Sequence, residues 1–192
     1  TGAGNTAVGQ ISQDDITTGA QNTAIGNGSG HALTTGSANT SLGYLANSTN
    51  TTGNHNICIG LNAQPSTTTV SAQCTLGDAN ITNLRCNDTS ISALSDSRDK
   101  TDVIDSPYGL DFINTVRPVQ FKWETRDGNG KDGTTRVGFL AQELLASCDG
   151  NNAVLDLVLD DNPEKLEAKY GNLVPIMAQA IKELSAKNDA LE

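Results

Sequence analysis

Apolar residues are sparse in the first part of the chain, and they recur there at a fixed interval within polar sequence. Each recurrence has an asparagine or glutamine, two intervening residues, a Val, Ile or Leu, and a closing glycine. Five copies follow one another at steps of 17 residues: 5–9 (NTAVG), 22–26 (NTAIG), 39–43 (NTSLG), 56–60 (NICIG) and 73–77 (QCTLG). A constant period over several copies indicates a solenoid, in which each repeat forms one coil.

Each coil is predicted to contain a short β-strand whose Val, Ile or Leu points inward, closed by a glycine with a backbone angle that other residues resist. The asparagines are expected to bond their own turns or to form an inward ladder rather than to bind ligands. His31 and His55 lie outside the repeated positions and are expected at the surface. Because one coil buries little apolar surface, we expect stability from stacked coils and from several chains packed together.

The pattern G-x-x-N-T-[AS]-[VIL]-G resembles the head repeats of trimeric autotransporter adhesins and similar segments of phage tail fibres. The resemblance covers residues 1 to about 77, which we call the repeat array. It implies a left-handed β-roll in a homotrimer that acts as a surface-binding or spacer module. A host cell-surface receptor or glycan is the partner that it implies for the repeat array. Residues 78–94 break the period but alternate in polarity, which predicts short strands in a connecting stalk.

The pattern after residue 95 is that of a small α+β domain. Alternation predicts strands at 119–123 and 136–140, and the residues 141–145 that follow are predicted to be helical. A short amphipathic segment is expected at 110–116, and a glycine-rich loop at 127–133. Six aromatic residues are expected to build the core: Tyr108, Phe112, Phe121, Trp123, Phe139 and Tyr170.

The tail from Asn172 to Glu192 is predicted to be a helix of ~30 Å. Met177, Leu184 and Leu191 stand seven residues apart, with further apolar residues beside them. Such a stripe is either a core face or a seam between helices of different chains, and the seven-residue recurrence favours the seam. The fold class is therefore a mainly β solenoid of 17-residue repeats, trimeric, followed by a small α+β domain that ends in a long helix.

Composition changes near residue 95. Residues 1–94 hold 12 of the 19 glycines but only five of the 34 charged residues (12 basic and 22 acidic). The predicted division is a repeat array at 1–77, a stalk at 78–94 and a charged globular domain at 95–192. A net charge of −10 argues against a nucleic-acid partner, and no stretch is apolar enough for membrane insertion.

No cofactor and no metal are expected. Cys58, Cys74, Cys86 and Cys148 lack C-x-x-C spacing and a histidine at ligand spacing, so free buried thiols are predicted. The acidic residues at 127, 132, 160 and 161 lack EF-hand spacing and are interpreted as solvated loop residues. Asp14-Asp15 is an unrepeated loop feature and not the carboxylate pair of a glycan-degrading enzyme. The start of the sequence within a repeat suggests that it is a piece of a longer protein.

The junction between the two compositions carries the run Ser95-Asp96-Ser97-Arg98-Asp99-Lys100. Residues five apart lie ~17 Å apart in a strand and ~140° apart on a helix. Ser95 and Lys100 can therefore meet only across a turn, and the aspartates and serine between them favour one. Local sequence thus permits a serine/lysine dyad, although the same run is also typical of an ordinary solvated turn.

Several separated motifs resemble the intramolecular chaperone domain of phage tail spikes and fibres. In order, these are Ser95-Asp96-x-Arg98-x-Lys100, the segments 110–113 (LDFI), 117–123 (RPVQFKW) and 137–143 (VGFLAQE), and the helix at 180–184 (AIKEL). The family includes endosialidase tail spikes, L-shaped tail fibres and a domain of myelin regulatory factor. The resemblance covers residues 95–192, but Cys148 to Asp161 match no motif of the family.

The resemblance implies a domain that trimerises, directs folding of the β-rich fibre before it and then cuts itself off beside Ser95. It implies Ser95 as the nucleophile of a single-turnover serine endopeptidase and Lys100 as its base, with Asp96 and Arg98 in support. Arg98, as a nearby cation, and burial in a trimer would favour the neutral lysine. Cleavage is expected at the junction of Leu94, Ser95 and Asp96, with the Leu94–Ser95 bond preferred.

The predicted protein is the C-terminal part of a virion tail fibre or spike involved in host recognition, folded in the host cytoplasm. Its partner is itself in a homotrimer. Three alternatives remain: a non-cleaving structural trimerisation module, a cellular trimeric adhesin, which would normally end in a membrane anchor, and a glycan-degrading enzyme.

Overall fold

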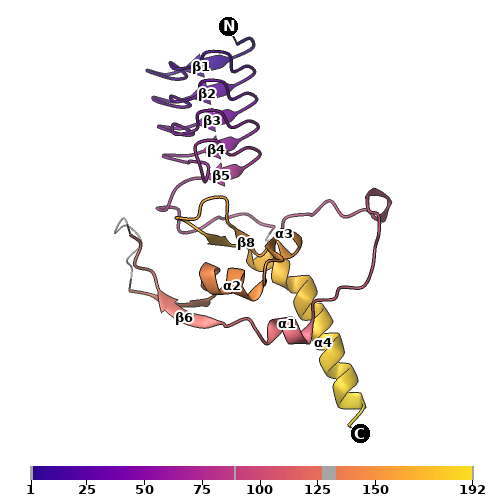
Figure 1. Cartoon of the computed structure of the whole chain (residues 1–192). Helices are drawn as coiled ribbons and strands as arrows, with labels where there is room; N and C mark the ends of the chain where they lie inside the picture. The colour runs from indigo at the N-terminus through magenta and orange to yellow at the C-terminus, as the bar shows by residue number, and fades with distance from the viewer. Residues whose placement is uncertain (1, 89, 127–132, 192) are drawn as a thin grey trace. The chain divides into compact units, whose positions relative to one another are not determined.

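The computed structural model describes residues 2–88, 90–126 and 133–191 (Figure 1). The chain divides into two units, and each is described by itself. The first comprises Thr1–Asn83, Glu124–Lys131 and Asp161–Lys165, and the second comprises Leu84–Trp123, Asp132–Asp160 and Leu166–Glu192.

The repeat array is a β-solenoid, as the 17-residue period predicts. It has one three-residue strand in each coil: β1 Thr6–Val8, β2 Thr23–Ile25, β3 Thr40–Leu42, β4 Ile57–Ile59 and β5 Cys74–Leu76. The strands form one parallel sheet in chain order, and the coils stack along it (Figure 1). The register pairs Thr23 with Thr40 and Ser41 with Cys58, so each 17-residue repeat makes one circuit of the coil.

The large apolar residue of each strand points outward, so the predicted inward orientation is wrong. These side chains are 38% to 56% exposed: Val8, Ile25, Leu42, Ile59 and Leu76. The central residues Ala24, Ser41 and Cys58 are buried instead. Successive side chains of a strand point to opposite faces, so a three-residue strand that buries its central residue must expose the residues on either side. The coil interior therefore receives small side chains.

Buried asparagines hold neighbouring coils together, which confirms the predicted inward ladder. The Asn22 Oδ1 atom accepts hydrogen bonds from the Asn39 backbone N–H at 2.9 Å and from Asn39 Nδ2 at 3.0 Å. Asn39 Nδ2 also donates to the Gly53 carbonyl at 2.9 Å, and Asn39 Oδ1 accepts from the Asn56 N–H at 2.9 Å. Each asparagine thus satisfies polar groups of the following coil, which would otherwise be buried without partners.

The ladder ends at Gln73, which occupies the asparagine position of the fifth repeat. Its backbone N–H donates to Asn56 Oδ1 at 3.0 Å, as an asparagine in this position would. Its own Oε1 accepts from the Ser66 N–H at 2.9 Å and from the Ser66 hydroxyl at 3.0 Å. The longer side chain therefore turns back to Ser66 in the preceding repeat, and its Nε2 also donates to Asp161 Oδ2 at 2.9 Å.

The closing glycines have the backbone angle that the sequence predicts. Gly26 has φ +135°, and a Cβ atom there would lie 2.4 Å from the Gly43 carbonyl oxygen. Any side chain would therefore collide with the backbone of the next coil, since such close approaches leave no room to relax. Glycine is required here both for its φ and for the spacing between coils.

The second unit is a small α+β domain, as predicted. It contains two antiparallel strand pairs, β6 Val119–Lys122 with β7 Thr135–Gly138 and β8 Val158–Leu159 with β9 Glu167–Ala168. The short helices are α1 Leu110–Ile113, α2 Ala141–Ser147 and α3 Asn152–Leu155, with 3-10 turns η1 Ser97–Asp99 and η2 Tyr170–Asn172. The long helix α4 spans Leu173–Asp189. Apart from Gly133, the glycine-rich loop expected at 127–133 lies outside the described residues.

The core of this unit is aliphatic, and the expected aromatic core is wrong in part. Its buried members are Leu144, Cys148, Leu155, Leu157, Val158, Leu173 and Ile176. Tyr108, Phe112 and Phe139 pack against this cluster, but Trp123 is 51% exposed and Tyr170 is 46% exposed. Branched side chains from α2, α3, β8 and α4 fill the space, so the aromatic rings lie at its margin.

Helix α4 has two apolar faces. Leu173, Ile176 and Ala180 are buried in the domain core. A second stripe remains exposed in the single chain: Val174, Met177, Ile181, Leu184 and Leu191. The stripe includes the three residues at seven-residue spacing, so the sequence pattern describes the exposed face and not the core face.

Glu183 joins α4 to the start of α1. Its Oε2 accepts from the Leu110 N–H at 2.8 Å, and its Oε1 accepts from Gln179 Nε2 at 3.0 Å. The bond from the Leu110 backbone holds the pKa of the Glu183 carboxyl below its ordinary value, with a smaller contribution from Gln179. The carboxylate thereby supplies an acceptor to an N–H that the short helix α1 cannot satisfy by itself.

The short strands predicted in residues 78–94 are absent from the described residues of that stretch, so this prediction is wrong. All described residues from 79 to 94 are exposed. A strand requires a partner for its backbone groups, and this segment has no neighbouring strand in the single chain.

The four cysteines are free thiols, but only Cys58 and Cys148 are buried, whereas Cys74 and Cys86 are exposed. The expectation of buried thiols is therefore wrong for two of them. Burial raises the pKa of the Cys58 thiol to about 11. No helix in the described residues is long and apolar enough to cross a membrane.

We expect Asn39→Ala to lower the free energy of unfolding by about 2 to 5 kcal/mol, because it leaves several buried polar groups of adjoining coils without partners, at roughly 1 to 3 kcal/mol each. Urea denaturation at a fixed chain concentration would measure this change. Asn27→Ala is the matched control, since Asn27 makes only an exposed side-chain bond to Gln10. Equal effects of the two substitutions would contradict the structural role of the ladder.

Candidate functional site

Ser95 and Lys100 lie on either side of the 3-10 turn η1. The turn brings the two side chains together, and Lys100 Nζ donates a hydrogen bond to Ser95 Oγ at 2.5 Å. Lys100 itself closes the turn, because its backbone N–H donates to the Ser97 carbonyl at 3.3 Å. Proximity across a turn is the arrangement that the five-residue spacing requires.

Asp96 builds this turn. Its backbone is extended, with φ −67° and ψ 132°, and its Oδ1 accepts from the Arg98 N–H at 2.9 Å as an N-cap does. The Arg98 guanidinium also binds the same carboxylate, with Nε to Oδ1 at 3.0 Å and Nη2 to Oδ2 at 2.6 Å. The Arg98 side chain holds the pKa of the Asp96 carboxyl below its ordinary value, with the Arg98 backbone N–H adding to the effect.

The bidentate pair changes the role that the sequence suggests for Arg98. A free guanidinium near Lys100 would repel its ammonium and favour the neutral amine. In the structure the Arg98 charge is directed at Asp96, whose opposite charge offsets it. Because Arg98 does not act on Lys100 in this way, the neutral amine would have to be favoured by removal of water around it.

The whole site is exposed in the single chain. Every residue from 90 to 107 is exposed, including both members of the Ser95–Lys100 pair. The apolar neighbours Ile91 and Leu94 are 96% and 105% exposed, and Val103 and Ile104 are also uncovered. Ser95 and Lys100 are therefore in contact, as a nucleophile and its base must be. Their surroundings, however, do not exclude water.

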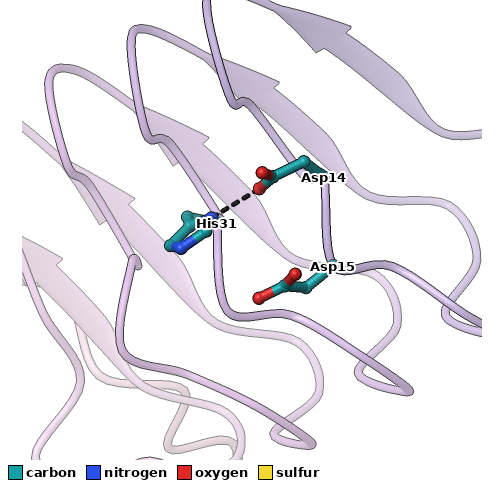
Figure 2. Close-up of side chains that lie close together, drawn as sticks. All are labelled: Asp14, Asp15 and His31. Atoms are coloured by element: carbon teal, nitrogen blue, oxygen red, sulfur yellow. Dashed lines mark hydrogen bonds and ion pairs between the residues drawn. The ribbon is translucent and has the colours of Figure 1, made fainter.

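A second cluster lies in the repeat array and was missed by the sequence analysis. Asp14, Asp15 and His31 bring together ligand atoms that all lie within 4.8 Å of one another (Figure 2). His31 Nδ1 and Asp14 Oδ1 form a very short hydrogen bond, which raises the pKa of His31. The signal was available, because residues 17 apart in a solenoid of this period occupy the same position in neighbouring coils.

Comparison with known families bears on the second unit. Residues 95–155 match a peptidase family described as the chaperone of endosialidase. This part of the chain is similar to the chaperone domain of endosialidase. This match confirms the recognition made from sequence motifs, and it begins at Ser95. Comparisons with curated proteins and with solved structures gave no match.

The match spans less of the chain than the motifs that suggested it, because it ends at Leu155 and leaves out the helix at 180–184. It nevertheless includes much of the segment from Cys148 onward that had matched no motif. That segment contributes α3 and the buried residues Cys148 and Leu155 to the core of the domain. Its conformation had no strong sequence signal because its helix is only four residues long.

We expect the pKa of the Asp96 carboxyl to rise toward its ordinary value in Arg98→Gln, because the substitution removes the charged donor that favours the carboxylate. Carboxyl ¹³C NMR during a pH titration would measure it. Arg117→Gln is the matched control, since Arg117 pairs with Glu143 and holds the pKa of that carboxyl down. Each substitution should raise the pKa of its own partner only, and an unchanged Asp96 titration in Arg98→Gln would rule out the pair.

Proposed function

We propose that this chain is the C-terminal part of a homotrimeric viral tail fibre or spike whose last domain directs folding and then releases itself by cleavage at Ser95. The observation that carries the proposal is the 2.5 Å contact between Lys100 Nζ and Ser95 Oγ at the first residue of the family match. A serine and a lysine in contact are the minimum machinery for serine peptidase chemistry without histidine.

The reaction is a single turnover within the chain. The neutral Lys100 amine takes the proton of the Ser95 hydroxyl, and Oγ attacks the carbonyl carbon of Leu94. The bond from that carbon to the Ser95 nitrogen breaks, and the nitrogen leaves as an amine after receiving a proton from the lysine. Water then hydrolyses the resulting ester, which frees the Leu94 carboxylate and restores the serine hydroxyl.

Assembly would control this reaction through the surroundings of Lys100. A lysine accepts a proton only as the neutral amine, and burial favours that form by disfavouring the ammonium. In the single chain Lys100 is exposed, and the apolar side chains of Ile91 and Leu94 near it are uncovered. Packing of this segment against other chains would exclude water and activate the lysine, so cleavage would follow correct assembly.

Exposed apolar surfaces in both units support a homotrimer. The outward column of the repeat array presents one Val, Ile or Leu in every coil. The exposed stripe of α4 borders a hollow of about 250 Å³ that is lined by Leu110, Ile113, Met177, Ala180, Ile181 and Leu184. Apolar surfaces that repeat along a solenoid and along a helix are suited to identical surfaces on further copies.

A chaperone role follows from the folding problem of the repeat array. Its sheet is parallel, and neighbouring strands are 17 residues apart in sequence, so few of its contacts are local. Sheets dominated by such non-local pairings fold slowly and expose unpaired strand edges meanwhile. A helical domain that first gathers three chains would supply a common starting register for the coils.

The proposed setting is a virion fibre that folds in the host cytoplasm before cleavage. A receptor or glycan on the host cell surface is proposed as the partner of the repeat array. This part of the proposal rests on the resemblance of the repeats to adhesin heads and fibre segments.

A non-cleaving trimerisation module is the second candidate. Two observations support it. Asp96 and Arg98 form the capped turn without help from Ser95, so the turn has a purely structural role available to it. Ser95 and Lys100 are also exposed to water in the single chain. The two candidates differ in one observable, because only the first produces two fragments from one chain.

We expect the wild-type chain of 20.0 kDa to release a fragment of roughly half its mass, whereas Ser95→Ala and Lys100→Arg stay intact. The first substitution removes the nucleophile, and the second retains a positive charge but cannot serve as a base near neutral pH. Mass spectrometry over time gives the masses and the cleaved bond.

Ser97→Ala is the control, because this exposed serine lies in the same turn and bonds Lys100 only through its backbone carbonyl, which alanine retains. Fragments from Ser95→Ala would point to another protease, and full cleavage of Lys100→Arg would exclude lysine as the base.

We expect Ile181→Lys to block trimer formation and to reduce cleavage strongly, because it places a charge in the exposed stripe of α4. Sedimentation equilibrium would measure the oligomeric state, and circular dichroism would show whether the single chain stays folded. Lys182→Ala, an exposed neighbour outside the stripe, should remain trimeric. A trimeric Ile181→Lys chain would mean that the stripe is not the interface.

A further inference from the structure

The cluster of Asp14, Asp15 and His31 joins two successive coils of the repeat array. Asp14 and Asp15 follow β1, and His31 occupies in the next coil the position of Asp14, so the stacking register sets them side by side (Figure 2). Figure 2 shows the imidazole facing the Asp14 carboxylate, with the Asp15 carboxylate close by. Two carboxylates and one imidazole therefore converge from both coils on one exposed spot.

The turn itself does not need these residues. The third coil makes a turn over the same part of its circuit with Ser48 and Thr49 at the equivalent positions. The third coil therefore serves as a comparison within the same chain, because its turn forms without ionisable side chains at these two positions. Two adjacent aspartates also repel each other, which destabilises the turn unless a cation compensates. The cluster therefore adds a property that the solenoid fold does not require.

We propose that Asp14, Asp15 and His31 bind a divalent transition-metal ion of the zinc class. The donor set decides the class of ion, because imidazole nitrogen suits zinc, nickel and cobalt, whereas calcium and magnesium prefer oxygen ligands alone. Three protein ligands with water in the remaining positions are a common arrangement for zinc. The two aspartates balance the charge of the ion, and the net charge of −10 on the chain favours its approach.

The ion would replace the proton that His31 and Asp14 share. Metal bonds of roughly 2.0 to 2.2 Å at each ligand require donor atoms about 3 Å apart or more. The present hydrogen bond is closer than that, so the side chains must separate slightly. Their exposed fractions of 41% and 42% leave room for such rotations. Binding displaces the proton that lies between His31 and Asp14, because metal ligands bind in their deprotonated form.

A bound ion would join the two coils outside the asparagine ladder. The ladder connects coils through buried amides, whereas the ion would connect them through exposed side chains. Since metal binding stabilises only the stacked form, the ion would oppose separation of the first two coils.

Isothermal titration calorimetry of the full chain with ZnSO₄ at pH 7.5 tests the proposal. Wild type should bind one more equivalent of Zn²⁺ per chain than His31→Gln, and Asp15→Asn should bind that equivalent at least tenfold more weakly. The exposed thiols Cys74 and Cys86 are present in every variant, so the difference between titrations isolates the site. Thermal unfolding without metal would verify that each variant is folded.

His55→Gln is the matched control, since it removes the other histidine of the repeat array, which has no acidic partner in the described cluster. It should keep the full stoichiometry. Identical Zn²⁺ titrations of wild type and His31→Gln would overturn the proposal. A second result would also overturn it: Mg²⁺ binding as tightly as Zn²⁺, and equally tightly in His31→Gln. The His31 imidazole would then contribute nothing to the binding of the ion.

Discussion

The hydrogen bonds of the buried asparagines set the register on which the repeat array depends. Each Oδ1 accepts from the backbone of the following coil, so a coil displaced by one residue would leave buried amides without partners. The outward column of Val, Ile and Leu residues, the close approach of glycines and the meeting of Asp14 with His31 all follow from that register. Polar bonding inside the coils thus leaves the apolar residues free to face outward.

The period of 17 residues predicted the solenoid, the ladder and the glycine angles, because each depends only on spacing within the repeat. Side-chain direction was predicted wrongly, since a strand of three residues carries too short an alternation to show which face is buried. In the second unit β6, β7 and α4 were predictable from their patterns, whereas β8, β9 and the aliphatic core were not, because Cys148, Leu157 and Val158 lie in or beside elements too short to show a period.

The contact between Ser95 and Lys100 could be predicted from the sequence, because residues five apart can come together only across a turn. The pairing of Arg98 with Asp96 was less evident, since several charged residues stand close together there and sequence does not show which of them bond. The structure separates two requirements of a serine/lysine dyad, namely proximity and desolvation. Local sequence supplies the first, whereas the second is not met in the single chain, where Ser95 and Lys100 are both exposed.

The end of the ladder at Gln73 has a consequence for how a repeat array of this kind can change length. Because Gln73 receives the bond of the preceding asparagine but turns its own amide back to Ser66, the last coil needs nothing of the same kind after it. Gain or loss of whole 17-residue units before that point would alter the reach of the array by about 4.8 Å per coil and leave its terminal coil intact. Recombination between homologous repeats would therefore be a simple route by which the length of the array varies.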